Sequence, residues 1–311
     1  MYHLISHAVY NDLSVFGDDP WSLFTDMGCD GIEMLTSYEE APRGHIPYTM
    51  SVHLPYATDW LAAWEDRPHD MDDYRSLYYM YGRTPEDVVS NITRAIDCAT
   101  VFSPAYGVMH LSNVDFNELR MRRYSLDSGR VIRAFCEVMN RVVSDMPGGE
   151  PPFKIAFENL WWPGLRLVDE SDFRLLDRHL EFDNWGICMD TGHLSVCLPR
   201  IYTEQDAIEA LLGIFDGYSR DLIDRIGTVH FHYSASAEYR ETFEEVTMDS
   251  LSLDEFISST YAHVSMMDWH RPFSDPRCSE ILDILQPTYV THEMLGADAV
   301  EKFRLQRSLL P

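Results

Sequence analysis

Cys188-Met-Asp-Thr-Gly-His193 ends an apolar run with a carboxylate and places a histidine three residues later. It belongs to a set of segments in which an apolar run ends in a side chain that binds metals. In chain order these are Ser51-Val-His53, Val108-Met-His110, Ala156-Phe-Glu158, Cys188-Met-Asp190, Thr228-Val-His230, Met267-Asp268 with His270, and Thr291-His-Glu293. Parallel strands of an α/β barrel carry their last residues to the face where its active site lies. The pattern therefore predicts a metalloenzyme built on a barrel.

Strand-like and helix-like segments alternate along the chain. Apolar runs bounded by turn residues predict strands near residues 2–10, 31–36, 48–56, 106–112, 153–160, 185–191, 226–233 and 287–295. Between them lie segments of helical period, such as the one that starts at Pro85 after the N-cap candidate Thr84, and another over 126–145. This order predicts a (β/α)8 TIM barrel, and we expect residues 1–311 to form a single domain.

Two of the predicted connections in the barrel are longer than an alternation of strands and helices requires. Residues 234–275 form an extended loop between the seventh and eighth strands, with a helix-like stretch over 253–263. Residues 58–84 form a second long connection that is rich in Trp, Tyr, Asp and Arg. Loops at the active face of a barrel shape or cover the substrate, and we expect that role for both.

The composition limits the classes of partner. The net charge is −27, with 51 acidic and 24 basic residues. Such a surface disfavours nucleic acid, because Lys and Arg supply most non-specific affinity for its backbone.

The six cysteines form no Cys-x-x-Cys pair, so no thiolate zinc site is indicated. No apolar stretch approaches the roughly 18 residues that span a bilayer, and the first residues lack the features of a secretory signal. We expect a cytoplasmic protein that does not enter membranes.

Glu158, Asp190, His230 and Glu293 fall at the ends of the fifth to eighth predicted strands. Their mixture of carboxylate oxygen and imidazole nitrogen suits Zn, Mn, Fe or Co. We therefore expect this quartet to bind a divalent metal.

Five further residues complete a ring of candidate ligands: His53, His110, His193, Asp268 and His270. Gly192 permits a sharp turn between Asp190 and His193. Two or three metals that share Glu158 as a bridging carboxylate would use all nine residues. With a single metal, the remaining side chains would bind substrate hydroxyls or water.

Three other histidines are not expected to bind metal. We expect His232 and His292 to point away from the ligand beside each of them, because neighbouring residues on a strand alternate. His7, on the first strand, is expected to be a core or hydrogen-bonded residue.

Several motifs around these candidate ligands resemble those of a known family. His53-Leu-Pro-Tyr56, Phe157-Glu158-Asn159, Met189-Asp-Thr-Gly-His193, Val229-His230 and His292-Glu293 resemble the xylose-isomerase-like barrel superfamily, in the right order over almost the whole chain. For its sugar epimerase branch, the resemblance implies one divalent ion held by the quartet. Glu158 and Glu293 would then move protons and His193 would contact substrate. For its endonuclease IV branch, it implies a trinuclear zinc site made of all nine residues.

The chain also departs from the family. Members often carry Asp three residues after the seventh-strand His, whereas this chain has His230-Phe-His-Tyr233. Two adjacent tryptophans, Trp161 and Trp162, follow Glu158-Asn159. These two side chains could stack on a sugar ring, or they could pack at the barrel rim against a second subunit. The second role would make the protein a homo-oligomer.

Two enzymatic hypotheses follow, and the first is a metal-dependent isomerase or epimerase of a sugar or sugar phosphate. In that reaction Glu158 and Glu293 transfer a proton beside a metal-bound carbonyl. The alternative is an endonuclease IV-like multi-zinc phosphoester hydrolase, and a minor one is a non-catalytic metal-binding protein. The net charge favours the isomerase, and the full set of ligands favours the hydrolase. The expected cofactor is one to three divalent ions. The substrate-binding candidates are His193, Tyr56, Trp161 and Arg271, with Arg166 as a further cation for a substrate phosphate.

Overall fold

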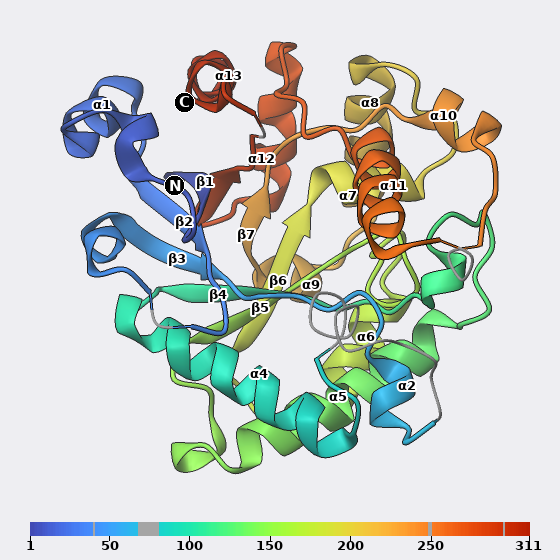
Figure 1. The fold of residues 1–311 in the computed structure, drawn as a ribbon. Coiled ribbons are helices and arrows are strands. Elements are labelled where there is room, and N and C mark those ends of the chain that lie inside the picture. The colour runs from blue at the N-terminus through green and yellow to red at the C-terminus, as the bar shows by residue number, and fades with distance from the viewer. Residues whose placement is uncertain (40, 68–80, 248–250, 295) are drawn as a thin grey trace.

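A computed structural model of the chain describes residues 1–39, 41–67, 81–247, 251–294 and 296–311. Eight parallel strands close into a barrel in which each strand pairs with its sequence neighbour and β8 pairs with β1 (Figure 1). The strands are β1 (Tyr2–Ala8), β2 (Gly31–Leu35), β3 (Thr49–His53), β4 (Tyr106–His110), β5 (Lys154–Glu158), β6 (Trp185–Asp190), β7 (Ile226–His230) and β8 (Tyr289–His292). The predicted (β/α)8 barrel is confirmed.

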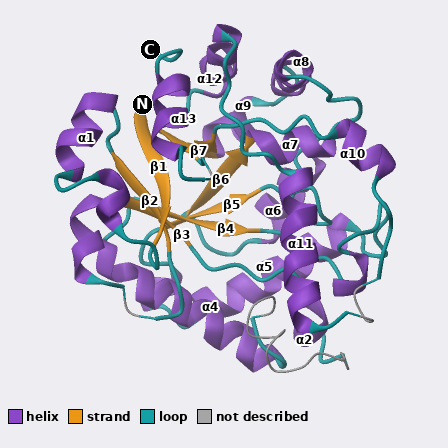
Figure 2. Cartoon of the chain, turned by 45° about the horizontal axis from the view of Figure 1, so that its top comes forward, coloured by secondary structure: helices purple, strands orange, loops and turns teal. Residues whose placement is uncertain are grey.

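Helices surround the strands (Figure 2). They are α1 (Pro20–Met27), α2 (Leu61–Trp64), α4 (Pro85–Ala99), α5 (Ser128–Ser144), α6 (Ser171–His179), α7 (Thr191–Cys197), α8 (Glu204–Phe215), α9 (Arg220–Arg225), α10 (Ala237–Thr242), α11 (Leu253–Met267), α12 (Ser279–Leu285) and α13 (Ala299–Arg307). Short 3-10 helices are η1 (Leu13–Phe16), η2 (Arg43–Tyr48), η3 (Thr100–Phe102), η4 (Phe116–Glu118), η5 (Pro147–Gly149) and η6 (Pro276–Cys278). The predicted start of α4 is confirmed, since Thr84 and Asp87 form a capping box and Pro85 is the first helical residue.

The strands separate two apolar regions. Inside the barrel, Leu4, Tyr106, Val108, Ala156 and Cys188 form a small buried cluster. A much larger cluster fills the layer between strands and helices. Because alternate residues of a strand face opposite sides, each strand serves both regions and presents its final residue at the rim.

The predicted extended loop over 234–275 contains α10 and α11, and η6 and α12 follow it before β8. In Figures 1 and 2, α10 and α11 lie beside α7, the helix that follows β6. Residues 248–250 of this connection lie outside the described residues, as do residues 68–80 of the long connection expected to cover the active face.

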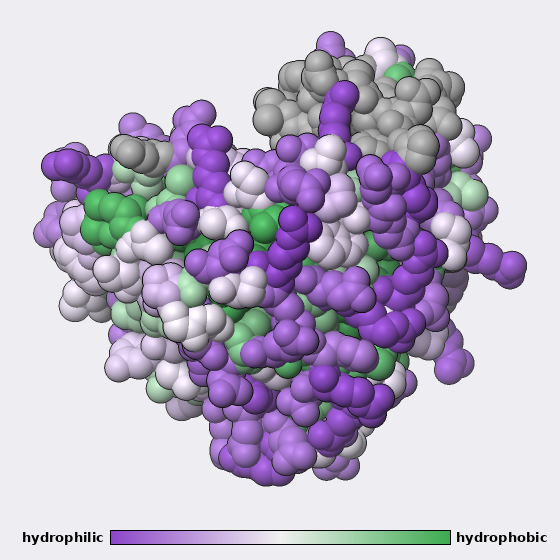
Figure 3. Space-filling model, turned by 90° about the horizontal axis from the view of Figure 1, so that it is seen from below, coloured by the Kyte–Doolittle hydropathy of each residue, from purple (hydrophilic) through white to green (hydrophobic). Residues whose placement is uncertain are grey.

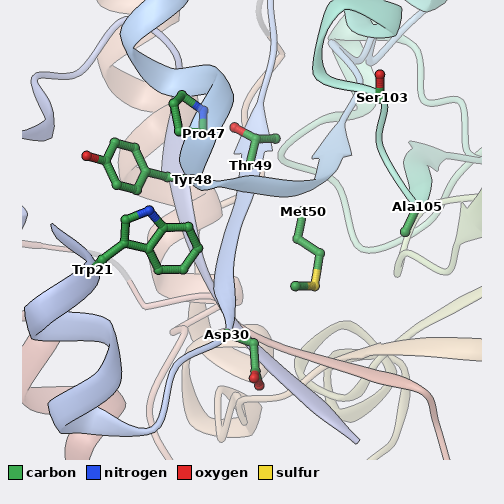
Figure 4. A pocket seen from close by; sticks show the side chains of 8 residues that line it. All are labelled: Trp21, Asp30, Pro47, Tyr48, Thr49, Met50, Ser103 and Ala105. Carbon is green, nitrogen blue, oxygen red and sulfur yellow. The ribbon is translucent and has the colours of Figure 1, made fainter.

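A pocket of about 340 Å³ lies at the amino ends of the strands (Figure 4). Its lining includes Asp30 before β2, Thr49 and Met50 at the start of β3, and Ala105 before β4. It therefore opens on the opposite end of the barrel from the carboxyl ends, where barrel enzymes place their chemistry.

The surface agrees with the acidic composition. Figure 3 shows hydrophilic side chains over most of one face, with hydrophobic ones in small patches. Among the described residues, no helix combines the length and apolar character needed to span a membrane.

Candidate metal centre

Glu158, the last residue of β5, lies at the centre of the predicted ligands. Its Oε2 atom is 3.1 Å from Nε2 of His53 and 3.2 Å from Nε2 of His110. Its Oε1 atom is 3.2 Å from Nδ1 of His193 and 3.3 Å from Nδ1 of His230. Strands β3 to β7 bring these residues together because each contributes its end, or the first turn after it, to the same rim.

His230 joins Glu158 to the other members of the predicted quartet. Its Nδ1 atom lies 3.6 Å from Oδ2 of Asp190 and 3.4 Å from Oε2 of Glu293. Three carboxylates from three strands thus face one imidazole nitrogen. Neighbouring ligands of one metal ion have this kind of spacing.

His193, Asp268 and His270 form a third group. Oδ2 of Asp268 is 3.2 Å from Nε2 of His193 and 2.7 Å from Nε2 of His270. The Asp268 and His270 side chains meet although the segment between them is not a regular strand, since His270 adopts a left-handed conformation with φ of 46°. Its Nδ1 atom lies 2.8 Å from the Glu293 carbonyl oxygen, which fixes the ring. A non-glycine residue in this conformation is held there by its surroundings.

The carboxylates are buried yet remain ionised beside the histidines. Glu158 and Asp190 are 1% and 0% exposed. Burial opposes ionisation, but His110 and His230 hold the pKa of Glu158 well below its usual range. Burial also opposes ionisation of Glu293, and His230 and His270 nevertheless lower its pKa to about 2. Without metal, protonated histidines balance these carboxylates, since the carboxylates raise the pKa of His270 to about 10, and divalent ions could take over that balance.

The buried polar atoms of the centre indicate divalent ions. Oε1 of Glu158, both ring nitrogens of His230 and Nδ1 of His232 are buried without a hydrogen-bond partner among the described residues. Buried polar atoms left without partners are costly, and metal ions would bind several of them. Several groups of ligand atoms are close enough to hold an ion, among them His53, His110 and Glu158; Glu158, Asp190 and His193; His193, Asp268 and His270; and His232, His270 and Glu293. The residues fit divalent metals, with nitrogen and oxygen ligands.

The exclusion of His232 from the site is wrong. Nε2 of His232 lies 2.9 Å from Oδ2 of Asp190, and its ring stacks on that of His270 at 4.2 Å. Residues two apart in an extended chain share one side, so the alternation rule should have placed His232 with His230. The spacing of His230 and His232 in the sequence therefore indicates that both rings lie on the side of the metal centre.

Gly192 also has a different role from the predicted turn. It lies within α7, and a Cβ atom there would stand 2.2 Å from Cε1 of His232. Glycine is needed because His232 passes close to the helix backbone.

Glu33 was missed by the sequence reasoning. It lies on β2 with 1% exposure, and its Oε1 atom is 2.7 Å from Nε2 of His230. The available signal was a carboxylate within the apolar segment Gly31-Ile-Glu-Met-Leu35.

Two other histidines behave as predicted. His292 points away from the centre, with its ring nitrogens 2.8 Å from Nε2 of Gln306 and 3.1 Å from Nδ1 of His3. His7 is buried and contacts the Asn11 carbonyl oxygen at 3.4 Å.

The predicted substrate-binding residues occupy different positions. Tyr56 is 43% exposed and stacks on His110 with ring centroids 4.4 Å apart. Trp161 is buried, and its ring centroid is 5.1 Å from that of His193. Arg271 is exposed, and its guanidinium lies over the Trp269 ring at 4.1 Å. Tyr56 and Trp161 thus border the ligands, whereas Arg271 packs on a neighbouring aromatic ring.

The sequence matches no protein-family model and no curated protein. Several solved structures nevertheless share the fold over nearly the whole chain. An L-ribulose 3-epimerase has a TM-score of 0.52 and 11% identity, and the match covers 99% of this chain and 93% of that one. Endonuclease IV from Thermus thermophilus has a TM-score of 0.51 and 12% identity, covering 99% and 98%. A D-tagatose 3-epimerase-like protein has a TM-score of 0.50 and 15% identity, covering 99% and 97%. The predicted resemblance to xylose-isomerase-like barrels is confirmed at the level of the fold.

Proposed function

We propose that this chain, which has the barrel fold of sugar epimerases and endonuclease IV, is a multi-metal phosphoester hydrolase that acts on a small phosphorylated carbohydrate. The arrangement of Glu158 is the observation that carries the proposal. Each of its two oxygens faces two histidines, which come from the ends of β3, β4 and β7 and from α7. A carboxylate with histidines beside both of its oxygens suits a bridge between two metal ions. A single ion at one oxygen would leave the two histidines beside the other oxygen without a metal.

The nine ligands would divide into three sets. His53 and His110 would share one ion with Glu158, and Asp190, His230 and Glu293 would hold a second ion with it. His193, Asp268 and His270 would hold a third. Clustered divalent ions activate a water molecule and stabilise the leaving oxygen when a phosphoester is hydrolysed.

The protein's own residues would orient and enclose the substrate. Tyr56, exposed at the rim against His110, is placed to contact a sugar or phosphate beside the first set. Trp161 closes the opposite side against His193, where it limits the entry of water. Burial of the carboxylates keeps the interaction with cations strong, because charges interact more strongly in a low dielectric.

The substrate class follows from charge. A protein with net charge −27 repels a long polyanion. A small phosphorylated molecule meets far less of this repulsion, because it enters one local site. Phosphorylated carbohydrate therefore suits this chain better than DNA.

A second candidate is a sugar isomerase or epimerase. Glu158 and Glu293 approach the same His230 nitrogen from two sides, at 3.3 and 3.4 Å. Two carboxylates that flank one position suit the removal and return of a proton on carbon. Against this candidate, the histidines around Glu158 leave it less free to act as a base.

Metal content tests the proposal. Elemental analysis of the protein purified without added metal is expected to find two or three ions per chain, and Glu158→Ala should lose more than one. Release of phosphate from sugar phosphates should accompany the metals. One ion per chain, with solvent hydrogen incorporated into a ketose, would support the isomerase instead. Absence of metal even after reconstitution would contradict both candidates.

A further inference from the structure

Two arginines near the metal centre form no close ion pair in the described residues, although Asp172 attracts Arg166 and Glu241 attracts Arg240. Within the described parts of the chain, neither Arg166 nor Arg240 forms an ion pair in which a carboxylate oxygen lies within 4.0 Å of a guanidinium nitrogen. Arg130, Arg174 and Arg304 do form such ion pairs. Neither Arg166 nor Arg240 is exposed. In a chain with 51 acidic residues, two half-buried cations without a paired anion require an explanation.

Both guanidinium groups act on Cys197, the last residue of α7. Arg240 donates to the carbonyl oxygens of Val196 and Leu198, the latter at 2.7 Å. Arg166 contacts the thiol of Cys197, the residue between them. The Nε atom of each arginine is buried and has no partner among the described residues. We call Arg166, Arg240 and Cys197 the arginine cluster.

The nearest acidic side chains are occupied elsewhere. Asp172 accepts from the backbone N–H groups of Arg166 and Leu167, at 2.9 and 3.2 Å. Glu241 accepts from the hydroxyl of Tyr202 at 2.7 Å. Arg240 donates from two of its nitrogens to backbone carbonyl oxygens, and the Nε atom of each arginine stays without a partner among the described residues.

The arginine cluster adjoins the metal centre along one helix face. His193 and Cys197 are four residues apart on α7, so they lie on the same face with about 6 Å between them along the axis. Trp161 packs against His193, and its ring centroid is 4.7 Å from that of Trp162. The indole Nε1 atoms of both tryptophans are buried without a hydrogen-bond partner in the described residues. The unpartnered atoms here are all N–H donors, which calls for a ligand made of acceptors.

We propose that the arginine cluster binds an oxyanion, a phosphate group of the substrate that is separate from the group held at the metal centre. The substrate part of this inference rests on the proposed function, whereas the anion site itself does not. Phosphate offers several acceptor oxygens, and the planar guanidinium fork binds them with paired hydrogen bonds. The substrate would thus carry two anionic groups, as a sugar bisphosphate does, with one at the metals and one at the end of α7.

Calorimetric titration of the purified, metal-containing protein with inorganic phosphate tests the inference. The wild type is expected to bind two phosphate ions per chain and Arg166→Met one. Glu158→Ala should lose the other ion and keep the one at the arginine cluster. Phosphate binding should also change tryptophan fluorescence in Glu158→Ala, because Trp161 and Trp162 directly follow Leu160, whose carbonyl oxygen accepts from the Cys197 thiol. Arg304→Met removes an exposed arginine bound to Asp26 and serves as the matched control.

Arg166→Lys keeps the charge without the fork and is expected to weaken phosphate binding about ten-fold. Arg240 is left unchanged in all variants, because it donates to the carbonyl groups at the end of α7 and its loss could unfold that segment. Phosphate binding by Glu158→Ala that is unchanged in the added Arg166→Met background would overturn the inference. A single phosphate that disappears with Glu158→Ala would overturn it as well, while leaving a metal-dependent function intact. Conversely, two phosphate sites in a protein with one metal would contradict the hydrolase and retain the arginine cluster.

Discussion

Oε1 of Glu33 lies 2.7 Å from Nε2 of His230, inside the barrel and below the metal centre. The two atoms approach closely without the alignment of a hydrogen bond. The other oxygen of Glu33 accepts from the hydroxyls of Tyr106, Ser51 and Thr291, at 2.8, 3.3 and 3.1 Å. Glu33 is thus held from three strands, and it meets the side of His230 that faces away from the ligand carboxylates.

Glu33→Gln is expected to weaken metal binding by roughly 10- to 100-fold, because partners that orient a ligand histidine have effects of this size. Titration of the protein with metal against a chromophoric chelator measures the change. Glu137→Gln, on the exposed face of α5, removes the same charge and should leave the affinity unaltered. Equal affinities for the Glu33 variant and the wild type would show that His230 is oriented by other contacts.

Gly192→Ala is expected to displace His232, because the new Cβ atom would stand 2.2 Å from its ring. The displaced ring would lose its contacts with Asp190 and His270, and metal binding should weaken. Gly213→Ala is the control, since Gly213 lies within α8 with no atom within 4 Å of the added Cβ. That control should raise the free energy of unfolding by about 0.5–1 kcal/mol. Metal affinity unchanged in Gly192→Ala would contradict the role assigned to the glycine.

Asp59 makes the stability depend on pH. Burial beside Asp115 raises its pKa to about 7. The unfolded chain releases this proton at about pH 4, so the free energy of unfolding falls as pH rises from about 4 to 7. The loss would amount to roughly 4 kcal/mol at most for a shift of about three pKa units.

Asp59→Asn keeps the side-chain shape and should remove this loss, so that the variant is more stable than the wild type above pH 7. Urea denaturation at pH 5 and pH 8 measures the difference. Asp97→Asn, an exposed substitution on α4, should shift both values equally. A variant at Asp59 that is less stable at pH 8 than the wild type would refute the assignment.

Salt is expected to stabilise the fold. A net charge of −27 makes the folded surface repel itself, and ions screen this repulsion. The thermal unfolding midpoint should therefore rise between 0.1 M and 2 M KCl. The same measurement in sucrose is the control, because sucrose adds no ions and raises the midpoint only through its exclusion from the protein surface. A midpoint that falls with KCl would show that specific ion pairs outweigh the self-repulsion.

The barrel could be predicted because its strand ends carry a repeated signal. Apolar runs that end in His53, Glu158 or His230 mark both a buried strand and a rim position, so fold and candidate ligands come from the same residues. The strand ends were less well predicted, since the chain leaves the barrel soon after each ligand. Local composition continues to look strand-like there, as in 226–233 compared with β7 at 226–230.

The parts that escaped prediction depend on contacts between distant segments. Glu33 gains its partner only when β2 and β7 face each other across the barrel interior. The left-handed conformation of His270 is fixed by the Glu293 carbonyl group, 23 residues away. The arginine cluster joins the loop after β5 to α10, and no spacing in the sequence signals it. These relationships arise from three-dimensional packing, which a pattern along one segment does not contain.

The candidate ligands run in chain order from His53 on β3 to Glu293 just after β8. A ribosome would therefore release the first two histidines long before the last carboxylate. A nascent chain that ends before β8 would lack Glu293 and the carbonyl group that holds His270. Full metal loading would then report that the chain has been made as far as Glu293 and that the barrel seam between β8 and β1 has closed.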